Sequence, residues 1–225
     1  YPPGRLVLWA AAMSAVLGGV VMLLLGPDLD TLRTAVRGFV ETFVKTQLKD
    51  VAGAGSIGEA ELSEMTEIAL VLLPAAMAIS AMGAMLFNLW LGGHVVRAAG
   101  RLRRPWPDLA GLTYPPGTPA LFAIATAATF LDGYPGLAAS AVFGALYLAY
   151  VLLGLAVIHW VTRGHPWRSF ALWGIYGGLI VFNTVASLLI AVLGLADTIR
   201  PMRQSQPLSS SSTGPSDRPG GDRPT

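Results

Sequence analysis

The stretch NLWLGGHVVRAAGRLRRPWPDL, residues 88–109, passes from an uncharged apolar segment into a cluster of arginine, proline and tryptophan. Its arginines outnumber its single acidic residue, Asp108. Short cytoplasmic loops of membrane proteins are enriched in Lys and Arg, because basic residues resist translocation. The stretch therefore predicts a membrane helix that ends in a cytoplasmic basic loop, formed by Arg97, Arg101, Arg103 and Arg104.

The composition of the whole chain agrees with a bilayer environment. Hydrophobic residues make up 53% of the 225 residues and charged residues 12%, about half the charged fraction of a soluble domain. The net charge of +2 is too small to indicate a nucleic-acid partner. The chain has no Cys, which excludes disulfides, thiolate metal ligands and a cysteine nucleophile.

Five apolar runs indicate membrane segments. A helix needs about 20 apolar residues to cross about 30 Å of hydrocarbon. Four runs are long enough, and a shorter one either crosses fully or forms a tilted or re-entrant piece. The long runs are residues 6–25, 68–96, 137–161 and 170–196, and the short run is 119–131. The sequence thus predicts an all-α, polytopic helical membrane protein with about five membrane segments.

Between the first two runs, residues 28–65 form an amphipathic insert. Leu32, Val36, Phe39 and Phe43 recur at helical spacing, while arginines occupy other faces. Acidic residues outnumber basic ones here, which suits the extracytoplasmic side. We expect an extracytoplasmic helical pair that lies on the membrane surface or on the other spans. The alternative is a lid over a substrate cavity.

The chain divides into a helical membrane domain, 1–199, and a tail, 200–225. The tail is rich in Ser, Pro and Gly and has almost no apolar residue, so we expect it to be disordered. If 119–131 crosses fully, the loop 162–168 is cytoplasmic and the tail lies outside. If 119–131 is re-entrant, both assignments reverse, and the arginines just after the last run favour that reversal.

Polar side chains within the runs are candidates for a substrate path, because in hydrocarbon they cost free energy unless they are paired or face a cavity. At 100° per residue, Tyr176, Asn183 and Ser187 fall within about 40° of one another on one helical face. Tyr147 and Asn88 lie in other runs and are further substrate-lining candidates. The alternative is that these residues only pack against neighbouring helices, with Asn183 bonded across an interface.

Gly174 and Gly178 form a G-x-x-x-G pair on the opposite face of the last run, which suits close approach of another helix. No Walker A loop, H-E-x-x-H or G-x-S-x-G motif is present, and no acid–base pair lies within a run. The three histidines are dispersed without a paired carboxylate. We therefore expect no enzymatic activity, no metal and no cofactor.

The chain resembles the YybS-like predicted membrane proteins in four stretches. These are YPPGRL at 1–6, the opening stretch at 88–109, LLGLAVIHW at 152–160 and LGLADTIRPMR at 193–203. This is a bacterial family of unknown function, here in its alphaproteobacterial form. In that family further helices normally precede the YPPGR motif, and the chain begins at Tyr1 rather than Met, so we expect it to be truncated at its N-terminus. The family is distantly similar to the S components of energy-coupling-factor transporters. The resemblance carries over no site residue.

Two function classes follow for a multi-pass protein of the bacterial cytoplasmic (inner) membrane. One is an S-component-like substrate-binding or transport subunit for a small molecule, whose partners are the lipid bilayer and other membrane subunits or a coupling ATPase. The other is a non-catalytic scaffold or regulator of an envelope complex. A transporter should gather its intramembrane polar residues at one cavity, whereas a scaffold should scatter them among helix contacts.

Overall fold

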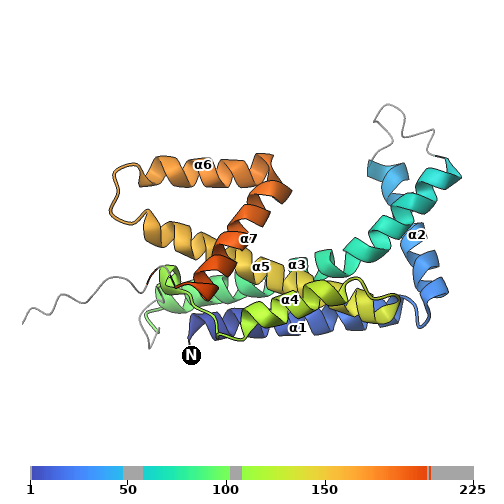
Figure 1. The fold of residues 1–225 in the computed structure, drawn as a ribbon, viewed down its shortest axis with the longest axis horizontal. Coiled ribbons are helices and arrows are strands. Elements are labelled where there is room, and N and C mark those ends of the chain that lie inside the picture. Colours follow the sequence, from blue (N-terminus) through green and yellow to red (C-terminus); the bar gives the residue numbers. More distant parts are fainter. Residues whose placement is uncertain (1, 48–57, 102–107, 202, 204–225) are drawn as a thin grey trace, which may run out of the picture.

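The computed structural model describes residues 2–47, 58–101, 108–201 and 203, and this part of the chain is helical without strands, which confirms the all-α class. Arg103, Arg104 and the predicted tail from residue 204 onward lie outside the described residues. Figure 1 shows α1 (Pro3–Leu25), α2 (Leu29–Gln47), α3 (Glu59–Ala98), α4 (Thr118–Ala128), α5 (Tyr134–Val161), α6 (Arg168–Val181) and α7 (Asn183–Ile199). A strap of residues 108–117, which includes the short 3-10 helix Leu109–Gly111, precedes α4.

Three of the helices, α1, α3 and α5, are long and apolar enough to span a membrane. Of these, α5 is central: 61% of its apolar stretch is buried within the chain, against 28% for α1 and 22% for α3. It packs against α1, α3, α4 and α7 (Figure 1). The outward surfaces of α1 and α3 carry many large apolar side chains, which a bilayer accommodates and water does not.

Small residues allow the three long helices to approach one another. A Cβ on Gly144 of α5 would lie 2.5 Å from the carbonyl oxygen of Ala75, so α3 comes this close only because that side chain is absent. On α1, a Cβ at Gly18 would lie 3.5 Å from the Cβ of Ala141 and 3.7 Å from the Pro74 carbonyl oxygen. Close packing of this kind holds helices together in lipid, where the hydrophobic effect does not drive their association.

The short third run crosses the bundle, although its helix alone is too short to do so. The 11 residues of α4 extend about 16 Å, roughly half the hydrocarbon thickness. Before α4, Thr113 in the strap lies against Gly4 at the start of α1. After α4, the Tyr134 hydroxyl donates to the Gly26 carbonyl at the end of α1. The chain between these contacts runs the length of α1, which favours a full crossing over a re-entrant piece.

The predicted fifth span, 170–196, is wrong: the chain turns back within it. Helix α6 ends at Val181 and α7 begins at Asn183, on either side of Phe182 with φ −111° and ψ 32°. Before α6, Arg163 donates two hydrogen bonds of 2.9 and 2.8 Å to Asp108 of the strap. After α7, Arg203 donates to two carbonyl oxygens of the same strap. Both ends of the α6–α7 hairpin therefore lie at one end of the molecule (Figure 1).

The return of the chain is explained by the packing of α7 on α5. A Cβ on Gly154 of α5 would lie 1.9 Å from the carbonyl oxygen of Ile190. A Cβ on Gly194 of α7 would lie 2.3 Å from the carbonyl oxygen of Tyr150. Two glycines on facing helices thus bring the backbones into contact, and this contact holds α7 along α5 instead of letting it continue straight from α6.

Helix α2 and the first part of α3 lie side by side as an arm at the far end of the bundle (Figure 1). The buried side chains of α2 recur every four residues and are Leu32, Val36, Val40 and Val44. The predicted apolar stripe included Phe39 and Phe43, but these rings are exposed and stack on each other with centroids 6.5 Å apart. The sequence therefore predicted the helix correctly and its buried face only in part.

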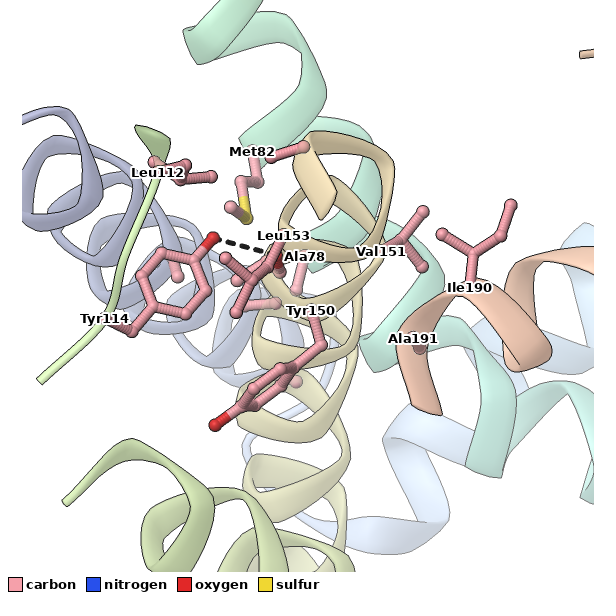
Figure 2. Packing of buried hydrophobic residues seen from close by; sticks show 14 residues of the cluster. Ala78, Met82, Leu112, Tyr114, Tyr150, Val151, Leu153, Ile190 and Ala191 are labelled. Atoms are coloured by element: carbon pink, nitrogen blue, oxygen red, sulfur yellow. Dashed lines mark hydrogen bonds between the residues drawn. The ribbon is translucent and has the colours of Figure 1, made fainter. Parts of the chain in front are cut away.

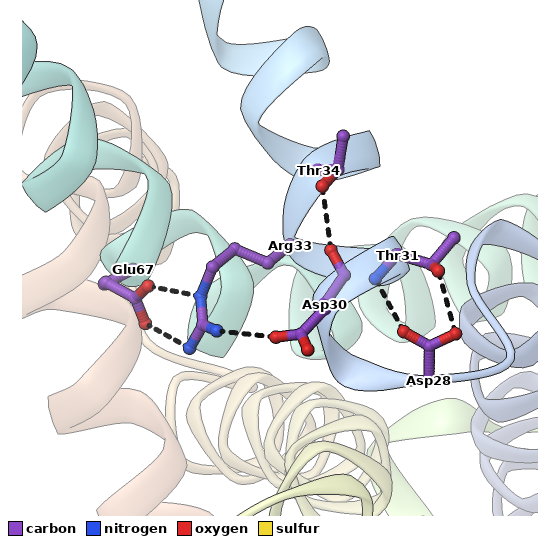
Figure 3. Close-up of polar contacts among 6 residues, drawn as sticks. All are labelled: Asp28, Asp30, Thr31, Arg33, Thr34 and Glu67. Carbon is purple, nitrogen blue, oxygen red and sulfur yellow. Dashed lines mark hydrogen bonds and ion pairs between the residues drawn. The ribbon is translucent and has the colours of Figure 1, made fainter.

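Polar contacts fix the register of the arm (Figure 3). Asp28 accepts two hydrogen bonds of 2.8 Å from Thr31, one from its backbone N–H and one from its hydroxyl, and these bonds lower the pKa of Asp28. Arg33 donates to Glu67 of α3 at 2.7 Å. Arg37 pairs with Glu59 in the same way. Exposed ion pairs add little stability, so these arginines mainly align α2 with α3.

Most of the described basic residues gather at one end of the molecule, which we call the arginine end. The start of α1, the end of α3, the strap, the loop 162–167 and the end of α7 lie there (Figure 1). The described arginines at this end are Arg5, Arg97, Arg101, Arg163, Arg168, Arg200 and Arg203. The arm occupies the opposite, acidic end, with Asp28, Asp30, Glu59, Glu61, Glu64 and Glu67. Arg203 thus lies at the same end of the molecule as Arg97 and Arg101.

Candidate functional site

The predicted polar stripe does not lie on one helix. Tyr176 belongs to α6, whereas Asn183 and Ser187 belong to α7, and the chain reverses between them. The 100° relation applies only within one continuous helix. It therefore no longer places Tyr176 on the face of the other two residues.

Two of the predicted residues meet each other. The hydroxyls of Tyr147 on α5 and Ser187 on α7 lie 2.7 Å apart. Ser187 also donates to the carbonyl oxygen of Thr184 at 3.1 Å, so Tyr147 is the donor in the bond between the helices. This bond satisfies both hydroxyls and joins α7 to α5, as expected for packing within a membrane bundle.

The remaining candidates stay apart from this pair. The Tyr176 ring lies edge-on to His159, with centroids 6.1 Å apart. Asn183 and Asn88 are exposed on α7 and α3. None of the five candidates lines the two cavities described below. Their role in a substrate path stays a prediction.

Gly174 and Gly178 make no close contact within the described chain. A Cβ added to either glycine would meet nothing within 4 Å, and no residue of α6 is buried. The predicted close approach of another helix stays a prediction, since no described helix of this chain provides it.

A groove of about 490 Å³ lies between α1, α4 and α5. Its wall is apolar apart from the Thr118 hydroxyl, and many of the residues are small. The lining residues are Leu8, Ala11, Ala12, Ala15, Val16, Gly19, Thr118, Leu121, Ala138, Val142, Ala145 and Leu146. The short side chains on α1 and α5 keep this space open.

A second hollow of about 300 Å³ adjoins the groove toward the arginine end. It is lined by Arg5, Leu8, Trp9 and Ala12, of which Leu8 and Ala12 also line the groove. Arg5 is exposed, and its guanidinium makes no hydrogen bond or ion pair with another described residue. The two spaces therefore lie next to each other along α1, with the Arg5 cation beside the hollow and an apolar wall along the groove.

A buried hydroxyl lies behind the groove. Tyr150 is 1% exposed, and its hydroxyl faces Thr118 and Thr198 without hydrogen-bonding geometry to either of them or to any other described residue. Thr118 donates its own hydroxyl to Pro115 at 2.8 Å and keeps its lone pairs available as acceptors. A buried polar group without a partner costs free energy, so most buried polar groups in native proteins are paired.

The neighbouring Tyr114, in the strap, is fully paired. Its hydroxyl donates to the carbonyl oxygen of Ala149 at 2.8 Å, and its ring packs edge-on against Tyr150 at 5.9 Å (Figure 2). Burial raises the pKa of Tyr114, so its hydroxyl stays protonated and remains a donor. The Tyr114 hydroxyl is thus satisfied by the backbone of α5, whereas the Tyr150 hydroxyl beside it has no hydrogen-bond partner among the described residues.

An ion pair is buried where the end of α7 meets the strap. Asp197 and Arg203 lie 2.5 Å apart, with side chains 6% and 8% exposed. Arg203 also donates to the carbonyl oxygens of Ala110 and Leu112, each at 2.6 Å. These bonds offset the cost of burying the charges and attach the end of α7 to the strap. The described residues contain no group of three or more His, Asp or Glu that could hold a metal ion.

The sequence contains a pattern that indicates the groove, but the pattern is made of small residues and not of polar ones. Ala11, Ala15 and Gly19 recur every four residues on α1 and leave room along one helix face. The Asp197–Arg203 pair was also missed, because each charge lies at the edge of an apolar run, where charges are usually exposed.

No curated protein and no solved structure matches the chain. The sequence profile of one family, described as "Predicted membrane protein (DUF2232)", matches residues 3–198. This confirms the family resemblance, whereas the similarity to transporter S components stays a prediction. With the match covering most of the chain and nearly all of its described helices, the protein belongs to the DUF2232 family of predicted membrane proteins.

Proposed function

We propose that the protein is a ligand-binding subunit that holds a small apolar or amphipathic molecule in the groove between α1, α4 and α5. The observation that carries this proposal is the groove itself, with its volume of about 490 Å³ and its apolar wall. Ligand sites in proteins are usually about 300–1,000 Å³, mostly apolar, and carry a few polar groups that orient the ligand. The groove has this size and an apolar wall, with the Thr118 hydroxyl as its one polar side chain. We propose it, in place of the polar stripe, as the binding site of a transport-class protein.

We also propose that the arginine end of the protein lies in the cytoplasm. Basic residues are enriched on the cytoplasmic side of membrane proteins. The loop 97–101, Arg163 and Arg203 come from distant parts of the sequence and lie at the same end. The protein would then be a multi-pass protein of the bacterial cytoplasmic membrane, with the arm of α2 and α3 outside. A reaction is not part of the proposal.

A groove-filling variant tests ligand binding. Gly19 lines the groove, and a Cβ there meets nothing within 4 Å, so the side chain of Gly19→Leu begins in open space and extends into the groove. Gly83 on α3 also has nothing within 4 Å and does not line the groove, so Gly83→Leu is the matched control. The measurement is the thermal shift of the full chain in detergent across a panel of lipids, quinones and vitamins.

We expect some compounds to raise the melting temperature of the wild type and of Gly83→Leu but not that of Gly19→Leu, since a ligand stabilises only the state that binds it. If Gly19→Leu responds as strongly as the wild type, the ligand does not occupy the groove. If no compound in the panel stabilises the wild type, the ligand-binding role is contradicted and an assembly role takes its place.

One observation favours assembly as the second candidate function. Helix α6 has no buried residue in the described chain, and its face at Gly174 and Gly178 is open. Membrane helices associate through such small-residue faces. A membrane subunit or a second copy could pack there, and co-purification of the wild type but not of Gly178→Leu with that subunit would support it.

A further inference from the structure

We infer that the molecule bound in the groove is an anionic phospholipid from the leaflet at the arginine end, with its phosphate on Arg5 and one acyl chain between α1, α4 and α5. This inference rests on the proposed ligand-binding role and names the class of ligand. It starts from the position of the hollow at Arg5 directly beside the groove, with Leu8 and Ala12 in the walls of both.

The chemistry of the outer hollow fits a lipid headgroup. Arg5 is an exposed cation without an acidic partner among the described residues. Guanidinium groups bind phosphate oxygens through two parallel N–H donors. Trp9, also in this hollow, is 60% exposed, and tryptophan concentrates at the level of lipid headgroups. The two side chains thus provide a charged and an amphipathic contact at the membrane interface.

The length of the groove fits an acyl chain in one leaflet. Along α1, its lining runs from Leu8 to Gly19, which is about 16 Å at 1.5 Å per residue. One leaflet contributes about 15 Å of hydrocarbon. A chain that enters beside Arg5 would therefore end near Gly19, where the groove ends. The wall along this path is apolar, as an acyl chain requires.

A protein helix fits the same space poorly. A helix about 10 Å wide and 16 Å long occupies on the order of 1,300 Å³, against about 490 Å³ in the groove. A free phosphate ion would satisfy Arg5 but would leave the apolar groove unfilled. A phospholipid is the occupant that uses both the hollow and the groove.

The Thr118 hydroxyl is the polar group at the wall of the groove. Tyr150 lies behind it and lines neither space, so an occupant of the groove meets Thr118 and not the buried Tyr150 hydroxyl. Pro115, the acceptor of the Thr118 hydroxyl, belongs to the strap, so this polar corner lies toward the arginine end. An ester carbonyl of a lipid lies just inside its phosphate, and therefore falls on this side of the groove.

Lipid competition tests the inference. The full chain is exchanged into an equimolar mixture of dioleoyl phosphatidylglycerol and dioleoyl phosphatidylcholine in detergent, and the retained lipid is identified by native mass spectrometry. We expect the wild type to retain phosphatidylglycerol at least about tenfold over phosphatidylcholine, which corresponds to about 1.4 kcal/mol. Arg5→Gln should reduce this preference to within about twofold, while Arg5→Lys, which keeps the charge, should retain most of it. Arg101→Gln, at another exposed arginine of the same end, is the control and should behave as the wild type.

The outcomes separate the two proposals. A wild type without headgroup preference, or an Arg5→Gln variant as selective as the wild type, overturns the assignment of the phosphate to Arg5 and leaves the groove as a ligand site. Gly19→Leu should retain neither lipid, and full retention by Gly19→Leu overturns the groove itself. If inorganic phosphate alone removes the preference for phosphatidylglycerol while lipid stays bound, the cation binds phosphate independently of the lipid, which also contradicts the inference.

Discussion

Helices α6 and α7 follow each other in sequence and are both short and apolar, yet they are held very differently. Helix α7 packs on α5 through Gly154 and Gly194, whose absent side chains allow backbone contact. Helix α6 contains the glycine pair Gly174 and Gly178, and nothing in the described chain approaches it. A glycine on one helix thus leads to close packing only where the facing helix offers a matching surface. The glycine pattern of a single helix does not reveal whether that surface exists.

The largest effect should come from the ion pair that fastens α7 to the strap. Asp197→Ala leaves the Arg203 guanidinium buried without its carboxylate, and breaking a buried pair in this way costs about 3–5 kcal/mol. The melting temperature of the full chain in detergent measures the loss. Asp108→Ala is the control, because its partner Arg163 is exposed and the change should be small. Equal melting temperatures for the two variants would show that α7 is not anchored by Asp197.

A smaller loss should follow from Gly154→Ala, which places a methyl group 1.9 Å from the Ile190 carbonyl oxygen and pushes α7 away from α5. Overpacking of this kind costs about 1–3 kcal/mol, and the close distance favours the upper part of that range. Gly178→Ala on α6 is the matched control and should melt with the wild type or slightly above it. If both variants melt alike, the contrast between the two helices is lost.

The hydroxyl pair between α5 and α7 should contribute less. Tyr147→Phe and Ser187→Ala each remove the 2.7 Å bond, and such bonds within membrane bundles are worth about 0.6 kcal/mol on average. A double-mutant cycle with both changes isolates this coupling. A coupling near zero would leave backbone packing as the main attachment of α7. If either variant keeps its stability but no longer shows a thermal shift with the ligand, Tyr147 and Ser187 line the substrate site after all.

The smallest effect on the single chain should come from Gly178→Leu. From the sequence alone, this change is expected to lower stability through overpacking. The structure predicts almost no change for the isolated chain, because a Cβ at this position meets nothing within 4 Å, and the free energy of unfolding should stay within about 0.5 kcal/mol of the wild-type value. A melting temperature that falls in the native membrane but not in detergent would identify a partner on α6. A fall in detergent would contradict the open face.

The long membrane helices could be predicted from the sequence, because an uncharged run of 20 or more residues leaves few alternatives. The reversal at Phe182 could not. No proline or glycine marks Phe182 or Asn183, and the apolar run continues through both residues. What turns the chain is the contact of Gly194 with α5, which depends on residues about 40 positions earlier. Hydropathy indicates whether a segment lies in lipid or in water, and it does not indicate where the chain reverses within an apolar run.

The candidate site was less predictable, for a related reason. A search for polar residues inside apolar runs finds side chains that need partners, and Tyr147 and Ser187 found them in each other. The groove is instead formed by residues that are small, such as Ala15 and Gly19. Small residues look the same in a sequence whether a neighbouring helix fills the space beside them or leaves it open. Only the position of α4 relative to α1 and α5 separates these cases.

The attachment of Arg203 to the strap also sets an order of events during synthesis. The Ala110 carbonyl and the Arg203 guanidinium that bonds to it are 93 residues apart. At about 5–20 residues per second, the ribosome reaches Arg203 roughly 5–20 seconds after it has placed Ala110. During that interval the Ala110 and Leu112 carbonyl groups lack the donors that they bond in the folded chain, and α7 lacks its attachment to the strap. Arg203 therefore acts as a latch that closes the arginine end last, and synthesis that stops before it leaves that end of the bundle open.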